Sequence, residues 1–166
     1  MNKALLFPLL CLAAPLALAD CAYRALAIEP LGAEHAALYG GAGERVQVEV
    51  HNFKRDGEVD SFPEPPMLVR QGAASCSVDG GIWLRHAVFL DRREQRLLVQ
   101  SFSGSGGELL IYDTQTCAEL SRLQLPEASW SLAGDSLVLG RQCRSAELSS
   151  CAQRLVHKLN AQCLPE

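Results

Sequence analysis

The sequence predicts an all-β domain of antiparallel sheets held together by disulfide bonds. Apolar and alternating runs recur between Gly-, Pro- and Asp-containing turns at a spacing of roughly 8–12 residues, a pattern typical of antiparallel sheets. Six of the seven cysteines follow the first twenty residues. An even number of cysteines in an exported chain indicates a disulfide framework.

The first segment, residues 1–19, is predicted to be a secretory signal peptide. It has Lys3 near its start, an apolar stretch over residues 4–16, and Ala17-Leu18-Ala19 as the cleavage site. We therefore expect cleavage after Ala19, export to an oxidising compartment, and a single all-β domain over residues 20–166. The resemblance described below implies that this compartment is the periplasm.

A membrane anchor and a lipoprotein signal are the two alternatives for this segment. A transmembrane anchor needs about 20 apolar residues, and this stretch is shorter. A lipoprotein would be lipidated at Cys21, but Asp20 is unfavourable directly before a lipid-accepting cysteine. We therefore expect no membrane anchor.

The charge of the chain excludes some partners. Lys3 is the only charged residue of the signal segment, so its removal changes the formal net charge from −4 to −5. An acidic chain without basic clusters is a poor candidate for binding nucleic acid or anionic membranes.

Strands are predicted wherever the pattern has a period of two or forms a short apolar run. These are residues 45–51, 82–90, 96–102, 108–112 and 119–125, followed by a hairpin over 130–132 and 136–140. Residues 33–39 and 152–159 fit a short helix or a strand equally well. Residues 56–66 contain four acids and three prolines, which predicts an irregular loop.

Residues 81–125 resemble one four-stranded blade of a β-propeller. The chain is too short for a closed propeller, so we expect about three blade-like sheets in an open, partial propeller. A simple meander or a sandwich is the alternative.

Three disulfides are expected. Cys143 and Cys151 enclose only seven residues, which suits a bridge at the base of a hairpin. A bridge between Cys21 and Cys163 would join the two ends of the mature chain. Cys76 and Cys117 would complete the set, although six cysteines allow fifteen connectivities.

The sequence contains no recognisable catalytic constellation. Paired cysteines leave no free thiol, the G-x-S-x-G motif is missing, and the glycines of residues 104–107 do not lead from a strand into a helix. The acidic pairs Asp91/Glu94 and Asp56/Glu58 lie in polar turns, where we expect solvent exposure. The histidines stand singly, at His35, His51, His86 and His157. We expect no enzyme, cofactor or metal, but a protein that binds.

One Ser/Gly segment could carry that binding. A two-residue turn would suffice after the strand at 96–102, yet serines and glycines are inserted with no bulky residue beyond Phe102. Such a loop can protrude and offer hydroxyl and N–H groups to a partner. The alternative is a plain flexible turn. The predicted partner-binding residues are Ser101, Ser103, Gly104, Ser105, Gly106 and Gly107.

This layout resembles the periplasmic immunity proteins that neutralise type VI-secreted peptidoglycan amidases. In that family a serine-bearing loop enters the cleft of the cysteine amidase and hydrogen-bonds its Cys/His pair. The resemblance implies that Ser103 and Ser105 are inserted, and that Gly104 and Gly106 allow the close approach. The implied partner is a cell-wall hydrolase, a cysteine amidase effector.

Periplasmic lysozyme inhibitors are a neighbouring alternative, with an S-G-x-x-Y motif. Here Ser103-Gly104 is followed by Gly107 where tyrosine is wanted, and Ser105-Gly106 by Leu109. A non-inhibitory ligand-binding module, in which the loop is only a connector, is the remaining alternative.

Overall fold

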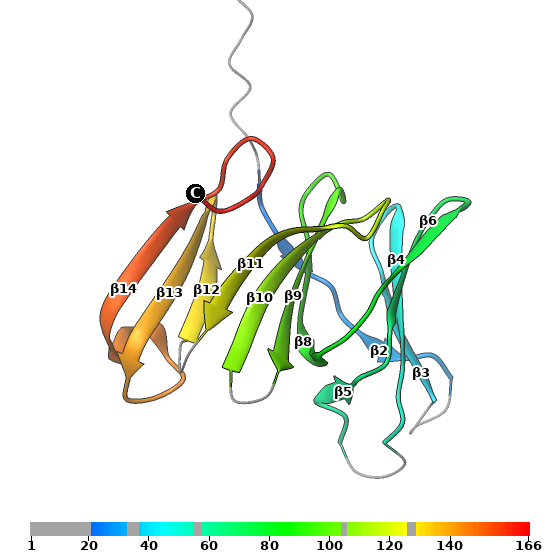
Figure 1. Cartoon of the computed structure of the whole chain (residues 1–166), viewed down its shortest axis with the longest axis horizontal. Coiled ribbons are helices and arrows are strands. Elements are labelled where there is room, and N and C mark those ends of the chain that lie inside the picture. The colour runs from blue at the N-terminus through cyan, green and yellow to red at the C-terminus, as the bar shows by residue number, and fades with distance from the viewer. Residues whose placement is uncertain (1–20, 33–36, 55–57, 104–105, 126–128) are drawn as a thin grey trace, which may run out of the picture.

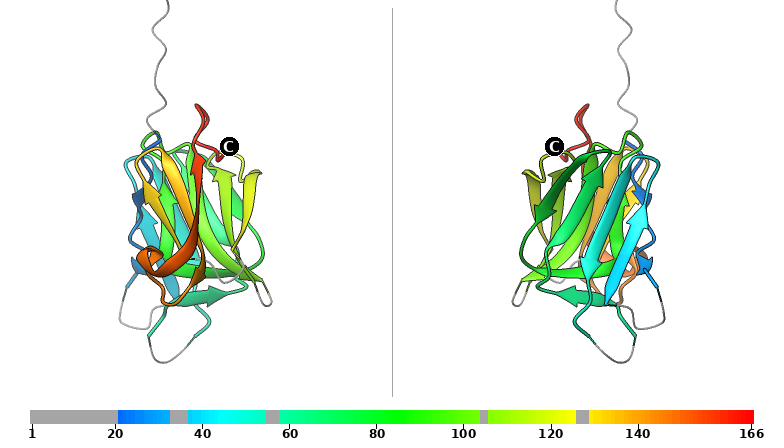
Figure 2. Two further views of the ribbon diagram at one scale, coloured as in Figure 1. Left: turned by 90° about the vertical axis from the view of Figure 1, so that its left-hand side faces the viewer. Right: turned by 90° about the vertical axis from the view of Figure 1, so that its right-hand side faces the viewer.

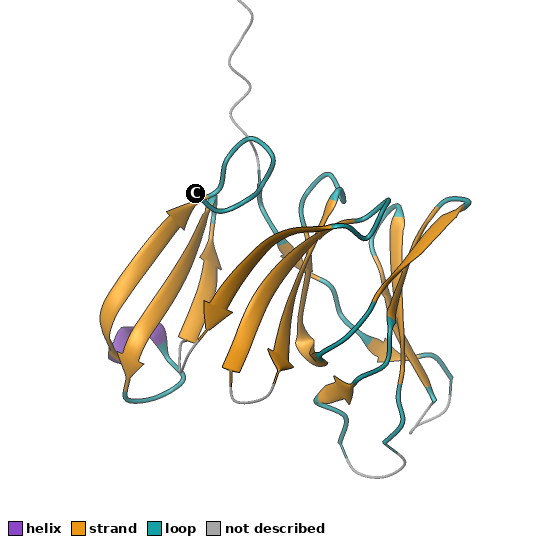
Figure 3. Ribbon diagram, viewed as in Figure 1, coloured by secondary structure: helices purple, strands orange, loops and turns teal. Residues whose placement is uncertain are grey.

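The computed structural model describes residues 21–32, 37–54, 58–103, 106–125 and 129–166. Within these ranges nearly all regular structure is antiparallel β-strand, with one short 3-10 helix at Leu148–Ser150 (Figure 3). The predicted all-β class is confirmed. Three sheets stand side by side, with the N-terminal sheet at the right of Figure 1 and the C-terminal sheet at the left.

The N-terminal sheet has five strands in the order β2-β3-β4-β6-β7. Its strands are β2 (Glu29–Pro30), β3 (Leu38–Ala42), β4 (Val46–His51), β6 (Met67–Gln71) and β7 (Ala74–Val78). The predicted alternation is realised in β4, because Val46, Val48 and Val50 are buried on one face.

The central sheet has six strands and contains the predicted blade. Its long path runs β1-β8-β9-β10-β11, and β5 pairs with the start of β8. Its strands are β1 (Arg24–Ala25), β5 (Ser61–Pro63), β8 (Ile82–Leu90), β9 (Arg96–Ser103), β10 (Gly106–Asp113) and β11 (Glu119–Leu125). The β8–β9 register shifts between Trp83, opposite Ser101, and Val88, opposite Val99. The residues between them bulge out of β8.

The C-terminal sheet is a three-stranded meander in the order β12-β13-β14. Its strands are β12 (Ser129–Ala133), β13 (Ser136–Cys143) and β14 (Cys151–Lys158). The segment 152–159, whose pattern fits a helix or a strand, is strand as far as Lys158, where β14 ends. Its Leu155 and Val156 lie opposite Leu139 and Val138 of β13. Figure 2 shows this sheet facing the viewer on the left, and the N-terminal sheet on the right.

Both faces of the central sheet are covered. On one face, Leu97, Val99 and Leu110 belong to a core shared with Val48 and Met67 of the N-terminal sheet. On the other face, the side chains of Leu98, Leu109 and Ile111 pack with Leu137 and Leu139 of the C-terminal sheet. Successive side chains of a strand point to opposite faces. Adjacent residues of β9 therefore enter different cores, which explains its apolar run and matches the expected blade-like sheets.

Three disulfides connect the described cysteines: Cys21–Cys163, Cys76–Cys117 and Cys143–Cys151. The expected pairings are all present. The first joins the two ends of the chain, and the second joins β7 of the N-terminal sheet to the turn after β10. In the third, the two cysteines face each other across β13 and β14.

Two sequence-based expectations need correction. The loop expected over residues 56–66 contains the short strand β5, although residues 55–57 lie outside the described residues. Pro63 ends β5, and β5 pairs only with β8, so it is an edge strand. A proline is tolerated at such an edge, which explains how this proline-containing segment includes a strand. The expected exposure of Asp91 and Glu94 is wrong, because both are buried.

The buried carboxylates replace missing backbone partners in tight turns. Asp91 accepts hydrogen bonds from the backbone N–H groups of Gln95 and Arg96, at 2.6 and 2.7 Å. Glu94 accepts from the N–H groups of Glu44 and Val46, at 2.6 and 2.9 Å, and so ties the β8–β9 turn to the β3–β4 turn. A buried carboxylate is tolerated when its oxygens are hydrogen-bonded in this way.

Candidate functional site

The candidate site is the β9–β10 hairpin, at one end of the central sheet. Antiparallel pairing continues from Arg96 opposite Asp113 to Ser103 opposite Gly106. The expected loop over residues 101–107 is thus largely strand, and only Gly104 and Ser105 separate the two strands. These two residues lie outside the described residues, as does the side chain of Ser103.

The side chain of Ser101 is buried within the protein and does not face a partner. It is 2% exposed, and its hydroxyl donates to the carbonyl of Phe102 at 3.4 Å. Gly81, in the turn between β7 and β8, lies so close that a Cβ atom there would overlap the Ser101 Oγ. Gly81 also has φ +88°, a conformation that favours glycine. Ser101, two residues before the end of β9, therefore lies against the β7–β8 turn.

Phe102 points to the opposite face of the sheet. It pairs with Gly107, where a Cβ atom would lie 3.3 Å from the Phe102 ring. The absence of a side chain at Gly107 therefore leaves room for the ring. Phe102 is 37% exposed, so part of the ring is available to a partner at the base of the turn.

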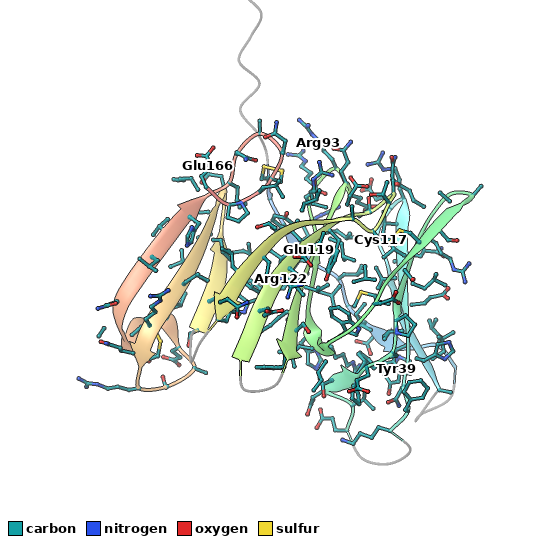
Figure 4. The ribbon with its side chains drawn as sticks, in the orientation of Figure 1. Tyr39, Arg93, Cys117, Glu119, Arg122 and Glu166 are labelled. Atoms are coloured by element: carbon teal, nitrogen blue, oxygen red, sulfur yellow. A yellow bond between two sulfur atoms is a disulfide. The ribbon has the colours of Figure 1, made fainter. Side chains whose placement is uncertain are left out.

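A polar cluster lies beside the hairpin on β10 and β11. Arg122 forms ion pairs with Glu108 and with Glu119, the latter at 2.6 Å between Nη2 and Oε2 (Figure 4). Gln124 donates to the other Glu108 oxygen at 2.6 Å. The hydrogen bond from Arg122 lowers the pKa of Glu119, so this carboxylate stays ionised. Exposed pairs of this kind contribute at most about 1 kcal/mol each, so their main effect is to orient the side chains.

A hollow of about 170 Å³ lies between this cluster and the β7–β8 turn, and Gly81, Trp83, Ser101, Tyr112 and Arg122 contribute to its lining. Burial raises the pKa of the Tyr112 hydroxyl to about 12; Glu119 adds to the rise and Arg122 opposes it. The tyrosine is therefore neutral at physiological pH. The Arg122 guanidinium and the Tyr112 hydroxyl are groups of the lining that can hydrogen-bond a partner.

The described residues bring together no group of three His, Cys, Asp or Glu side chains suited to a metal ion. The six cysteines that the structure describes are all disulfide-bonded. Among the helices in the described part of the chain, none has the length and apolar character needed to cross a bilayer.

Comparison with known proteins identifies the family. The sequence model of a family described as "Immune protein Tsi1" matches residues 21–163. The chain belongs to the Tsi1 immune protein family. A curated relative, "Immune protein Tsi1" of Pseudomonas aeruginosa, is 37% identical over 150 residues, which cover 87% of this chain and 86% of the relative. The resemblance to immunity proteins drawn from the sequence is therefore confirmed.

Within this Tsi1 family member, the structure separates the predicted site residues into two groups. Ser101 and Gly107 support the hairpin from within the sheet, whereas Ser103 and Gly106 are the last pair before the turn. The sequence-based reasoning missed Gly81 and Arg122. For Gly81, the double glycine at residues 80–81 was the available signal in the sequence. No local sequence pattern marks Arg122.

Proposed function

We propose that this protein is the immunity protein of a type VI-secreted peptidoglycan amidase. It is exported to the periplasm after cleavage at Ala19, and it protects the cell by blocking the effector's active site without any catalysis of its own. Membership of the Tsi1 immune protein family is the observation that carries this proposal.

The hairpin is the element that we assign to the blocking contact. Its strands are held on both faces by the neighbouring sheets, through Leu98 and Val99 in the two cores. A rigid support lowers the conformational entropy lost on binding, and small residues at the tip suit a cleft shaped for a peptide. Ser103 and Ser105 supply hydroxyl groups that can hydrogen-bond polar groups inside such a cleft.

The test is a double substitution, Ser103→Arg with Ser105→Arg. The matched control is Ala74→Arg with Ser75→Arg, which adds the same charge at exposed positions of β7. We expect the hairpin variant to fold, to lose inhibition of the purified amidase, and to stop protecting cells that carry the effector in the periplasm. The control variant should inhibit and protect as the wild type does.

Equal protection by both variants would refute the assignment of the hairpin. If the wild-type protein inhibits a lysozyme and leaves the amidase unaffected, this result favours the lysozyme-inhibitor alternative instead.

A further inference from the structure

Phe53, just after β4, is the most exposed large apolar side chain in the described part of the molecule, at 66%. It contributes little to the folded state by burial, since most of its ring remains in water. A single exposed apolar residue is ordinary on a protein surface. The surroundings of Phe53 distinguish it.

The backbone around Phe53 is fixed. Asn52 is buried and exchanges two hydrogen bonds with the backbone of Lys54, at 2.8 and 3.0 Å, so that Phe53 lies at the tip of a closed turn. The ring of Phe53 stacks on that of His51, with centroids 6.4 Å apart and planes inclined by 10°. An aromatic ring held in one orientation loses little conformational entropy on binding, which is a property of interface anchors.

Phe53 and the hairpin lie toward the same end of the molecule. The strands β4 and β9 both run to the lower end of Figure 1, where β5 also lies. Pairing connects β5 to the hairpin through β8, because Pro63 of β5 lies opposite Ile82, and Ile82 lies opposite Phe102 of β9. One partner contacting this end could meet the hairpin and Phe53 together.

Acidic side chains surround this region. The exposed carboxylates of segments 58–64 and 79–81 are Glu58, Asp60, Glu64 and Asp79. Within the described ranges none of the four forms an ion pair, and the nearby Lys54 ammonium donates to a backbone carbonyl. The backbone N–H of Glu64 donates to the carbonyl of Gly81 at 3.1 Å, which places the Glu64 backbone beside the β7–β8 turn. The partner surface that complements these carboxylates is basic.

We propose that Phe53 is a second anchor for the effector, separate from the hairpin. Its ring enters an apolar hollow of the effector that is bordered by Lys or Arg side chains, and the carboxylates of Glu58, Asp60, Glu64 and Asp79 face those cations. This inference rests on the proposed immunity function and names the chemistry of the partner surface.

The test measures the affinity of the purified mature chain for a purified type VI-secreted peptidoglycan amidase. Phe53→Ala should weaken binding by about 10-fold or more, mainly through faster dissociation. Phe53→Trp should retain most of the affinity. Val156→Ala is the matched control, since Val156 is 60% exposed on β14, in a different sheet. Its affinity should stay within about 2-fold of the wild type.

Two results overturn the second anchor: a Phe53→Ala affinity within about 2-fold of the wild type, or an equal loss in Val156→Ala. The hairpin variant separates this failure from failure of the proposed function. If Phe53→Ala binds normally while Ser103→Arg with Ser105→Arg does not bind, only the second anchor is wrong. If the wild-type chain neither binds nor inhibits the hydrolase, the proposed function fails as well.

The role of the four carboxylates around Phe53 is tested separately, by the salt dependence of the association rate. Raising the salt concentration should slow association of the wild type, because screening weakens the attraction between acidic and basic surfaces. Glu64→Gln should reduce this salt dependence, and Glu49→Gln, on the N-terminal sheet, should leave it unchanged. An association rate independent of salt contradicts the basic partner surface.

Discussion

Replacing Glu94 by alanine tests whether one buried carboxylate joins two sheets. Its oxygens accept three backbone hydrogen bonds from the β3–β4 turn, from Glu44, Arg45 and Val46, at 2.6, 2.7 and 2.9 Å. Gly43 leaves the space for this carboxylate, because a Cβ atom there would overlap it. The substitution therefore removes a contact between the N-terminal and central sheets.

The expected loss of stability follows from the burial of the three donors. Only the Val46 N–H is in a fully buried bond, and an unpaired buried donor costs about 1–3 kcal/mol. The other two N–H groups lie on exposed residues, where water can replace the carboxylate, so each contributes about 0.5–1 kcal/mol. We expect Glu94→Ala to lower the free energy of unfolding by about 3 kcal/mol, a large part of a small domain's stability.

The effect should depend on pH. Burial raises the pKa of Glu94, but the three N–H donors and Arg24 outweigh it, so the pKa lies below its ordinary value. The ionised carboxylate thus stabilises the folded state above the unfolded-state pKa, and this contribution is lost as pH falls through the folded-state pKa. The difference between the wild type and Glu94→Gln should shrink on acidification.

The assay is urea unfolding of the wild type, Glu94→Ala and Glu94→Gln at pH 7 and at several lower pH values. Glu44→Ala, which removes an exposed carboxylate from the neighbouring turn, is the control and should change stability by less than about 0.5 kcal/mol. A Glu94→Ala protein as stable as this control would refute the reasoning.

Three further predictions concern stability. Gly81→Ala should lower the free energy of unfolding by about 1–3 kcal/mol through steric overlap and strain at φ +88°, as measured by thermal melts. Gly72→Ala is the control for strain alone, because Gly72 has φ +60° and no atom lies near its Cβ position; an equal loss of stability in this control argues against overlap at Gly81. Replacing Cys21 and Cys163 by serine should cost about 5 kcal/mol in the chain-entropy picture for a separation of 142 residues, measured by urea unfolding; a cost below about 1 kcal/mol would contradict it. Arg85→Ala should cost about 2 kcal/mol by the same measurement, because this guanidinium bonds a backbone carbonyl at 2.7 Å and a carboxylate at 2.6 Å, and Arg85→Lys should not restore it.

Local periodicity was sufficient to predict β4 of the N-terminal sheet and most of the central sheet. The alternation in β4 and the apolar runs of β8 and β9 were recognisable because side chains in a strand alternate between two faces. The strands β6 and β7 were not predicted, since five residues such as Met67–Gln71 give too few repeats of a pattern. The strand β5 was hidden by acids and prolines that an edge position tolerates.

The interior of the hairpin could not be predicted from the same signals. A serine in a Ser/Gly run suggests solvent exposure. Ser101 is enclosed instead, because the turn at Gly81, twenty residues earlier in the sequence, lies against it. Asp91 and Glu94 looked solvated because a turn of charged residues usually is. Their burial depends on backbone N–H groups, which no pattern of side chains reveals.

The Cys21–Cys163 bridge closes the chain into a covalent ring that contains every described strand. A single peptide bond cut between these cysteines opens the ring but leaves both fragments attached. Proteolytic nicking at an exposed turn should therefore give one band on a non-reducing gel and two after reduction. The strands on either side of the cut remain tethered at a high effective concentration, so their pairing can survive the cut.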